Sequence, residues 1–369
     1  MKILIFNWRD LKHSWAGGGE IYVFELAKRW VKMGHEVTVF CGQDPYQKLA
    51  DEEEYQGIKI IRKGGTFSLY FWAPIYYFKK LRKNVDIIID VQNGIPFFTP
   101  LFSRIPKVAF VYHVHKNQFF YQLHFPVSYI GYFIEQYVFP IIYRGVQVVA
   151  ISETTKEELV SIGFKAKNIK VVYCGIDKPN SKRKGLIKKF SVPTLLYLGR
   201  IKGYKRVDLL VDIFKDILRD LPSARLIIAG WGTEASGLTD IVMRSSVRRR
   251  VDILGPVTNA EKIELLSRAW LFVNLSIGEG WSMAVIESNM HGTPAVAFNV
   301  PGLSESIRHG YTGLLAKDRE DIIKKILKII TNEEYRERIS KNAKKWAESF
   351  SWEKAAEESL GVMQKLVNK

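Results

Sequence analysis

The chain has few cysteines and lacks several motifs that mark common protein classes. Only two cysteines, Cys41 and Cys174, occur among 369 residues. That number is too small for a disulfide framework and indicates a reducing compartment, so we expect a cytoplasmic protein. No Walker A pattern and no G-x-S-x-G elbow is present in the sequence. These absences argue against a P-loop NTPase and an α/β-hydrolase.

Long apolar runs are also missing. The longest apolar and aromatic region, residues 125–143, is interrupted by Pro126, Glu135, Gln136 and Pro140, so it is not expected to span a bilayer. The first six residues, MKILIF, predict a buried strand and not a signal peptide, because the run is short and leads into polar residues. No repeat at solenoid or propeller spacing occurs.

Acidic residues are scarce in the first half of the chain. The formal net charge is +17; residues 1–190 hold 28 Lys and Arg against 16 Asp and Glu, and residues 191–369 hold 27 against 22. Between Tyr55 and Ile134 only Asp86 and Asp90 are acidic, and the same span is rich in Phe, Tyr and Trp. A basic surface interleaved with aromatics suits an anionic membrane surface or a nucleic acid. A solvated basic face is the alternative.

The aromatic segment at residues 67–84, FSLYFWAPIYYFKKLRKN, predicts a helix over about 70–83 with a cluster of basic residues at its end. Rings beside Lys and Arg suit the lipid headgroup region, where each cation contributes about 1 kcal/mol near an anionic leaflet. Residues 119–126 either extend this surface or line an acceptor site. Burial of the aromatics in the core or between domains is the competing interpretation.

Strands and helices alternate along the chain, which predicts parallel sheets in α/β domains. Buried strands are expected near residues 2–7, 36–41, 58–62, 85–91, 108–113, 146–151, 169–172, 194–198, 225–229, 251–254, 271–275 and 295–298. The polar, basic stretch 176–192 is the best linker candidate. We therefore predict two Rossmann-like domains facing a cleft, over residues 1–180 and 181–350, and a last helix over 351–369 that crosses back to the first domain.

The most informative motif has two carboxylates eight positions apart, Glu279 and Glu287, around Gly280, Trp281, Ser282 and Met283. Glu279 is expected on a loop and Glu287 inside the helix that follows. The helix N-terminus then lies between two acceptors suited to sugar or ribose hydroxyls, and its free N–H groups suit a diphosphate. A surface helix with two solvated glutamates is the alternative.

This E-x7-E pattern, with its continuation HGTPAVAFNVPGLSESIRHGYTGLL, resembles the nucleotide-binding domain of retaining family 4 glycosyltransferases, which have the GT-B fold. The resemblance implies that Glu287 binds the ribose and that Glu279 binds sugar hydroxyls. Backbone N–H groups of residues 281–283 would contact the sugar or the β-phosphate. Ser282 stands where the family usually has Gly.

Two cations form a second motif, within GRIKGYKRVD at residues 199–208. Arg200 follows a predicted strand and Lys205 precedes a predicted helix, so both can hold a departing diphosphate. The segment resembles the family's G-R-x4-K-G pattern, with Arg206 in place of the usual Gly. A solvated basic loop is the alternative.

Glycines mark further candidate donor contacts. Gly18 and Gly19, in AGGGE, allow close backbone approach. They lack the G-x-G-x-x-G spacing of a nicotinamide-binding turn. By resemblance they line the donor diphosphate or the acceptor, although a plain strand–helix turn is possible. By the same resemblance Gly230 lies beside the nucleotide, and the backbone near Leu254 meets the base.

Two histidines follow a predicted strand, in the sequence YHVH. The family often has a His here that hydrogen-bonds the donor sugar; His115 aligns best and His113 is the second choice. Two His at i and i+2 share one face of a strand and could bind zinc, but no paired carboxylate is near in sequence.

The resemblance implies a metal-independent hexosyltransferase with a nucleotide diphosphate sugar as co-substrate and no cofactor. No Asp-x-Asp occurs to support a divalent-metal donor site. The acceptor would be a hydroxyl on a lipid-linked or cell-surface glycan precursor, with docking on an anionic membrane surface and no nucleic acid. Two alternatives stay open: a GT-B-fold sugar-nucleotide epimerase, and a basic nucleic-acid-binding or membrane-binding protein without catalysis.

Overall fold

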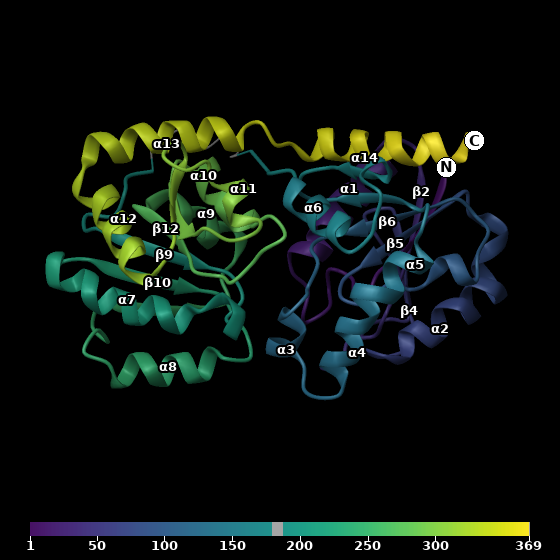
Figure 1. Ribbon diagram of the computed structural model, residues 1–369, viewed down its shortest axis with the longest axis horizontal. Coiled ribbons are helices and arrows are strands. Elements are labelled where there is room, and N and C mark those ends of the chain that lie inside the picture. Colours follow the sequence, from purple (N-terminus) through teal and green to yellow (C-terminus); the bar gives the residue numbers. More distant parts are fainter. Residues whose placement is uncertain (179–186, 369) are drawn as a thin grey trace. The chain divides into compact units, whose positions relative to one another are not determined.

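The computed structural model describes residues 1–178 and 187–368. The chain forms two compact units, the first from Met1–Gly175 with Ser351–Lys369 and the second from Ile176–Phe350 (Figure 1). The predicted boundary between residues 180 and 181, and part of the predicted linker, lie outside the described residues.

The first unit is built on an eight-stranded sheet in the order β3-β4-β2-β1-β5-β6-β7-β8. All neighbouring strands are parallel except the pair β3 and β4. The core is made of Ile, Val, Leu and Phe from strands that are buried on both faces, as expected for a parallel sheet. The strands are β1 (Lys2–Phe6), β2 (Glu36–Cys41), β3 (Glu52–Tyr55), β4 (Ile58–Arg62), β5 (Ile87–Gln92), β6 (Lys107–Val111), β7 (Gln147–Ala150) and β8 (Ile169–Val171).

Strand β3 was missed by the sequence analysis because its sequence, EEEY, has almost no apolar residues. It is an antiparallel edge strand, and charged edges are common because they discourage pairing with other chains. Its Glu53 forms an ion pair with the buried Arg62 of β4 at 2.8 Å. The ion pair between Glu53 and Arg62 therefore helps to hold β3 against β4. A hydrophobic pattern in the sequence cannot predict such a strand.

The helices of the first unit depart most from expectation in their aromatic parts. The single helix expected over 70–83 is instead α2 (Ser68–Tyr76), a π-helical turn (Tyr77–Leu81) and a 3₁₀ turn (Arg82–Asn84). Pro74 lies inside α2 and has no N–H for the helix ladder, which weakens it before the π turn begins. The other helices are α1 (Gly18–Lys32), α3 (Gln118–Gln122), α4 (Val127–Phe133), a π turn (Ile134–Val138), α5 (Phe139–Ile142) and α6 (Glu153–Ser161).

The last helix, α14 (Trp352–Val367), packs on the first unit although the second unit precedes it in sequence. The indole Nε1 of Trp30, in α1, donates to the carbonyl of Ala356 at 3.0 Å. Trp352 lies beside Tyr22 of α1, with ring centroids 6.1 Å apart. Figure 1 shows α14 in yellow alongside α1.

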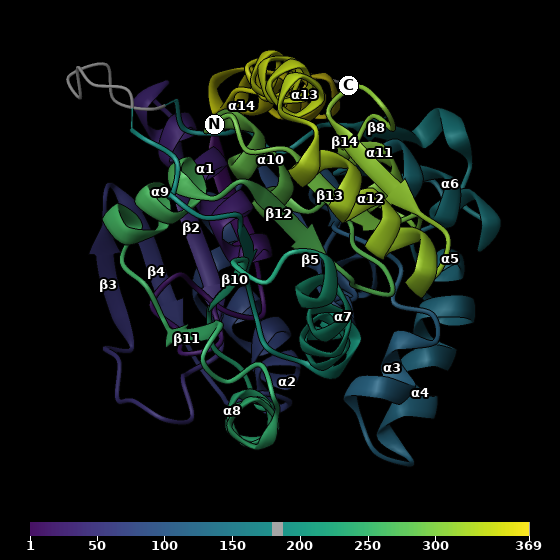
Figure 2. The ribbon, with the colours of Figure 1, turned by 90° about the vertical axis from the view of Figure 1, so that its left-hand side faces the viewer.

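The second unit contains a six-stranded parallel sheet in the order β11-β10-β9-β12-β13-β14 (Figure 2). In chain order this is the 3-2-1-4-5-6 arrangement of the doubly wound Rossmann fold. Its strands are β9 (Thr194–Leu198), β10 (Arg225–Ala229), β11 (Val251–Gly255), β12 (Leu271–Asn274), β13 (Ala295–Phe298) and β14 (Gly313–Ala316). Strand β14 was not expected, because its glycine-rich surroundings resemble a loop.

Helices cover both faces of this second sheet. They are α7 (Val207–Asp220), α8 (Ala235–Arg244), α9 (Asn259–Arg268), α10 (Met283–Met290), α11 (Leu303–Ser306), α12 (Arg319–Thr331) and α13 (Glu333–Ala347). Helix α7 places six buried apolar residues on one face, which joins it to the core. Among the described residues, no helix is both long enough and apolar enough to cross a membrane.

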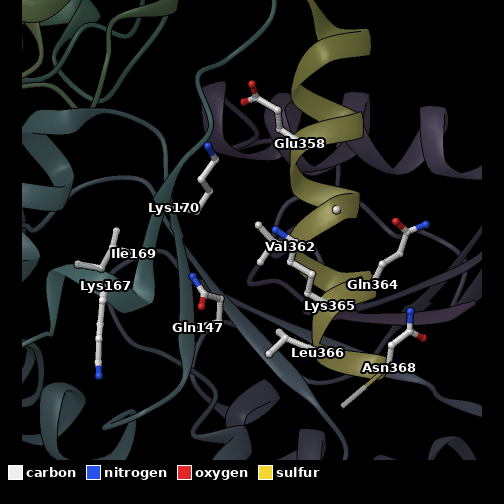
Figure 3. A pocket seen from close by; sticks show the side chains of 11 residues that line it. Gln147, Lys167, Ile169, Lys170, Glu358, Val362, Gln364, Lys365, Leu366 and Asn368 are labelled. Carbon is white, nitrogen blue, oxygen red and sulfur yellow. The ribbon is translucent and has the colours of Figure 1, made fainter.

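A cleft of about 860 Å³ lies in the first unit between α14 and the start of β7 and β8. Figure 3 shows Lys167 and Lys170 on one side of it and Lys365 on the other. Gln147 and Ile169, which line the cleft, are the first residues of their strands. Ligands of open α/β sheets bind at the carboxyl ends of strands, so this cleft is not the site expected from the sequence.

Candidate functional site

Two of the predicted donor residues, Lys205 and Glu279, meet at the switch point of the second unit's sheet. Strand β9 lies between β10 and β12. The strands that directly follow β9 in sequence are added on one side of it, and β12 and the later strands are added on the other side. Lys205 follows β9 and Glu279 follows β12, both at the carboxyl ends of the strands. The two loops are joined by a hydrogen bond from the Ile277 N–H to the Tyr204 carbonyl at 2.9 Å. A crevice at such a point is where doubly wound sheets bind their ligands.

Glu279 is the centre of a polar cluster. Its Oε1 contacts the Lys205 ammonium in an ion pair whose side chains are 14% and 13% exposed. Asn274 Nδ2 and Ser276 Oγ donate to the same oxygen at 3.2 and 2.8 Å. Asn274 also donates to Ser282 Oγ at 3.2 Å. Asn274 and Ser276 were missed by the sequence analysis; their signal is the abrupt change from an apolar strand to polar residues.

The ion pair changes the protonation behaviour of Lys205. Burial alone would lower the pKa of Lys205, but the charge of Glu279, the charge of Tyr204 and the hydrogen bond to Glu279 together raise the pKa above its ordinary value. The ammonium is therefore charged at neutral pH and available to an anion. Arg200, on the same loop, lies over the Trp231 ring at 5.9 Å, and its carbonyl accepts a hydrogen bond from Tyr197 at 2.6 Å.

Both residues that replace a family glycine adopt left-handed backbone conformations. Arg206 has φ 53° and ψ 43° before α7, and Ser282 has φ 69° and ψ 74° before α10. Only glycine adopts this region without steric cost, which explains the usual Gly at these positions. Arg206 and Ser282 therefore both adopt a backbone conformation that favours glycine.

A turn from another strand holds the Glu279 backbone. The Glu279 N–H donates to the Pro301 carbonyl at 3.1 Å. Gly302 has φ 74°, and a Cβ there would lie 2.1 Å from the Glu279 carbonyl oxygen. The Pro-Gly turn after β13 therefore requires glycine so that the two loops can pack together.

Glu287 lies inside α10, as predicted, and its Oε1 pairs with Lys262 of α9 at 2.7 Å. Lys262 was not predicted, because a lysine in an amphipathic helix carries no distinctive signal. At the end of α10, burial and then the charges of Lys262 and Lys189 lower the pKa of His291 to about 4. Its Nδ1 lies 3.1 Å from Ser267 Oγ, so a neutral imidazole is held there.

The other predicted residues of the motif lie at and just before the start of α10. Trp281 is 2% exposed, and its ring packs edge-on against Phe350 at 5.1 Å. Met283 is the first residue of α10, and Gly280 precedes Trp281 in the loop. N–H groups in the first helical turn have no partner within the helix, so they are suited to an anion.

Gly230 and Leu254 lie at the carboxyl ends of β10 and β11. A Cβ on Gly230 would lie 1.8 Å from the Gly199 carbonyl oxygen, and its N–H donates to the Gly255 carbonyl at 2.8 Å. Gly230 thus contacts the chain at the carboxyl ends of both strands that neighbour β10, namely β9 and β11. Leu254 is 47% exposed, an unusual degree for a large apolar residue on a strand. Its proposed role beside the base stays a prediction.

Gly18, Gly19 and His115 belong to the first unit. Gly18 and Gly19 are the first two residues of α1. The Gly19 carbonyl accepts a hydrogen bond from the Tyr112 hydroxyl at 2.9 Å, and a Cβ at Gly19 would lie 2.6 Å from the Tyr112 ring. Packing against Tyr112 therefore requires Gly19, independently of any ligand.

His115 follows β6 and is 9% exposed. Its Nδ1 lies 3.0 Å from Oε1 of Glu135, a residue that the sequence analysis noted only as an interruption of an apolar segment. The His113 and His115 rings are 4.0 Å apart. Across residues 1–178 and 187–368, no three His, Cys, Asp or Glu side chains come together as a metal site would need, so the zinc interpretation gains no support.

The fold and this site define the class of protein. Two Rossmann-like sheets, each with its own switch point, form the GT-B architecture of glycosyltransferases. Residues 16–178 match the family model described as glycosyltransferase family 4, and residues 177–346 match the one described as glycosyl transferases group 1. The chain belongs to this family of glycosyltransferases.

Relatives in other organisms agree with this assignment. The chain is 26% identical to an uncharacterised glycosyltransferase of Methanocaldococcus jannaschii, over 98% of this chain and 97% of the relative. It is 24% identical to D-inositol 3-phosphate glycosyltransferase of Thermobifida fusca, over 94% and 88%. It is 25% identical to a phosphatidylinositol N-acetylglucosaminyltransferase component from Arabidopsis thaliana, over 50% and 42%.

Solved structures confirm the predicted GT-B fold. Sucrose-phosphate synthase from Thermosynechococcus elongatus matches with a TM-score of 0.80 at 20% identity, over 99% of this chain and 98% of that one. The Anabaena protein HepE, in complex with UDP-glucose, matches with a TM-score of 0.77 at 18% identity, over 99% and 100%.

Proposed function

We propose that this protein is a retaining hexosyltransferase that moves a hexose from a nucleotide diphosphate sugar to an acceptor hydroxyl. The observation that carries the proposal is the cluster of Lys205, Glu279 and the α10 N-terminus at the switch point of the second sheet. It offers a cation and free N–H groups to a diphosphate, and a carboxylate to hydroxyls.

Binding of the donor would rearrange the ion pair. In the structure, Glu279 neutralises Lys205. A diphosphate would share the ammonium with Glu279 and lower the attraction between them, which frees Glu279 oxygens for sugar hydroxyls. As the bond to the sugar breaks, Lys205, Arg200 and the helix N-terminus would stabilise the negative charge on the departing phosphate.

The retaining, metal-independent course rests on the family resemblance of the motif. The acceptor hydroxyl would attack from the face that the diphosphate leaves, with the leaving phosphate taking its proton. Glu287, held by Lys262, would bind the ribose. The UDP-glucose complex of HepE supports a UDP-sugar as the first donor to test.

The donor site is tested by binding. Wild-type protein should be stabilised thermally by a UDP-, GDP- or ADP-sugar, and Glu287→Gln should weaken that donor by about tenfold because a hydrogen bond to a charged group is lost. The matched control is Glu264→Gln, which changes an exposed glutamate on α9 that pairs with Arg268. If no sugar nucleotide binds the wild type, the proposal is wrong. Conversion of the donor to a free isomer without transfer would indicate the epimerase instead.

Exposed residues of the first unit support a second part of the proposal, namely that the acceptor is lipid-linked and lies at an anionic membrane. Phe71 and Phe78 are 68% and 48% exposed, beside the exposed cluster Lys79, Lys80, Arg82 and Lys83. The continuous helical stretch from α4 to α5 also exposes Ile130, Phe133, Tyr137 and Ile141, at the three- and four-residue spacing of one helix face. An apolar helix face in water is typical of a membrane-surface or partner-binding helix.

Figures 1 and 2 both show α2 and α4 on the side of the first unit away from α14, which supports treating their exposed residues as one surface. The two relatives whose names include phosphatidylinositol or inositol 3-phosphate are compatible with a lipid-linked or polyol acceptor.

Vesicle sedimentation tests the membrane surface. The protein should bind vesicles containing phosphatidylglycerol more tightly than pure phosphatidylcholine vesicles, and salt should weaken the binding. Replacing Phe71 and Phe78 with Ser should reduce binding, whereas the same change at Ile241 and Met243, exposed on α8, should not. Equal binding by both double variants would contradict the assigned surface. Salt-sensitive binding to RNA or DNA in place of vesicles would favour the nucleic-acid alternative.

A further inference from the structure

The buried carboxylate of Glu135 stands out because it lies in an otherwise apolar segment. It belongs to the π-helical turn between α4 and α5, and the whole residue is 0% exposed. A buried charge is costly unless it is hydrogen-bonded, and π turns are frequent at functional sites. Glu135 therefore needs partners, and the structure provides them from the loop that follows β6.

Five N–H groups from four residues surround this carboxylate, among them the side-chain amide of Gln92, which donates to Oε1 at 3.4 Å. The backbone N–H of His115 donates to Oε1 at 2.8 Å, and that of Lys116 donates to Oε2 at 2.8 Å. The side-chain amide of Gln136 donates to Oε2 at 3.2 Å. The His115 Nδ1 lies 3.0 Å from Oε1. The carboxylate thus holds both the backbone and the ring of the same histidine.

The protonation of Glu135 decides which nitrogen of His115 bears hydrogen. Burial alone would raise the pKa of Glu135, but the hydrogen bonds from His115 and Lys116 and the charge of His115 lower it. A carboxylate has acceptors only, so the Nδ1 that faces it must carry the proton. In the neutral ring, Nε2 is then the nitrogen without hydrogen.

Aromatic neighbours fix the plane of the ring. The Phe119 ring stacks on His115 with centroids 5.0 Å apart and planes 29° apart, and the His113 ring lies at 4.0 Å. Phe119 in turn packs on Gly131 of α4, where a Cβ would lie 2.8 Å from the Phe119 ring. The helix that carries Glu135 therefore also supports the ring that stacks on His115.

We propose that Glu135 is a positioning residue: it fixes His115 as the Nδ1–H tautomer and directs Nε2, as hydrogen-bond acceptor, to a hydroxyl of the donor hexose. This inference rests on the proposed function and on the family resemblance, which implies that His115 contacts the donor sugar. Glu135 touches no substrate and acts through His115 alone. The same pairing selects a sugar with a hydroxyl at that position, because a deoxy sugar would leave Nε2 unpaired.

The test combines spectroscopy with kinetics. In protein labelled with ¹⁵N-histidine at about pH 8, long-range ¹H–¹⁵N correlations should show His115, assigned by its loss in His115→Gln, with protonated Nδ1 and bare Nε2. Glu135→Gln should mix or reverse the tautomers, since the amide can present its NH₂ to Nδ1. It should lower kcat about tenfold or more while changing donor affinity much less.

Glu158→Gln is the matched control. Glu158 pairs with Lys116, the residue after His115, at 3.1 Å, and the same isosteric change there should leave both the tautomer and kcat as in wild type. A wild-type spectrum with hydrogen on Nε2 would overturn the proposal even if Glu135→Gln fails to fold. So would a folded Glu135→Gln with the wild-type tautomer and kcat. The expected tautomer in a protein that transfers no sugar would support this geometry and contradict the proposed function instead.

Discussion

At the scale of single residues, the candidate site depends on charges that are partly removed from water. Lys205 and Glu279 are each less than 15% exposed, and each neutralises the other in the absence of ligand. Removing one member of such a pair leaves the other buried without compensation. Function and local stability are therefore coupled at this pair.

We expect Lys205→Gln to lower kcat by about 10²- to 10³-fold, the loss typical when one preorganised donor to a developing negative charge is removed. Initial rates at saturating donor and the dissociation constant of the nucleoside diphosphate are the measurements. Lys215→Gln is the control, because Lys215 lies on α7 and pairs with Asp212 away from the site. A kcat within twofold of wild type would show that Lys205 does not act on the leaving group. The melting temperature separates this result from misfolding.

At the scale of elements, α10 joins the candidate site to the core of the second unit. Its first turn carries the predicted phosphate contacts, its middle carries Glu287, and its end carries His291. The pKa of His291 in the folded chain is about 4, compared with 6.5 for the ordinary residue. The unfolded chain therefore takes up a proton at higher pH than the folded chain does.

This difference makes stability depend on pH with a definite sign. As the pH falls from 6.5 to 4, protons bind the unfolded state preferentially, so the free energy of unfolding should decrease. Urea unfolding at several pH values in that window should show a shallower dependence for His291→Gln than for wild type. His124→Gln, which changes an exposed histidine, should keep the wild-type slope. Identical slopes in all three proteins would contradict a neutral His291 in the folded chain.

Sequence reasoning is most successful where an element is both buried and regular. The parallel strands other than β14, and the amphipathic α7, follow from runs of Val, Ile and Leu. It fails at β3, whose position depends on the ion pair of Glu53 with Arg62, and at α4–α5, whose apolar face is turned outward. A tertiary contact places β3 although its residues are polar, and solvent exposure of apolar residues at α4–α5 is the opposite of what hydrophobic patterning predicts.

The candidate site also contains residues that the sequence predicts and residues that it does not. Glu279, Lys205 and Glu287 are found by motif spacing, but Asn274, Lys262 and Glu135 are not. Each of these three residues contacts a partner at least five positions away in sequence. A single sequence carries no signal for such pairs unless the residue is out of place, as a lone glutamate in an aromatic helix is.

At the scale of the whole molecule, the chain leaves the first unit after Gly175 and returns to it at Ser351. These two points are in contact: a Cβ on Gly175 would lie 2.2 Å from the backbone nitrogen of Trp352 and 2.6 Å from the carbonyl carbon of Ser351. Backbone atoms cannot move aside as a flexible side chain can. The start of α14 is therefore seated against the first unit only because residue 175 has no side chain.

Gly175→Ala should consequently displace the start of α14 and lower the free energy of unfolding by about 1–3 kcal/mol, the usual cost of overpacking. Chemical denaturation followed by tryptophan fluorescence measures this, since Trp30 and Trp352 both lie under or within α14. The control is Gly361→Ala on the same helix, where a Cβ meets no atom within 4 Å and alanine should stabilise the helix by up to about 1 kcal/mol. Destabilisation by Gly175→Ala together with stabilisation by Gly361→Ala would establish that α14 is held at its first turn. A neutral Gly175→Ala would show that Gly175 is not tightly packed against the start of α14. Helix α14 follows the second unit in sequence but belongs to the first, so we expect its displacement to weaken the unit that carries His115 and not the donor cluster of the second unit.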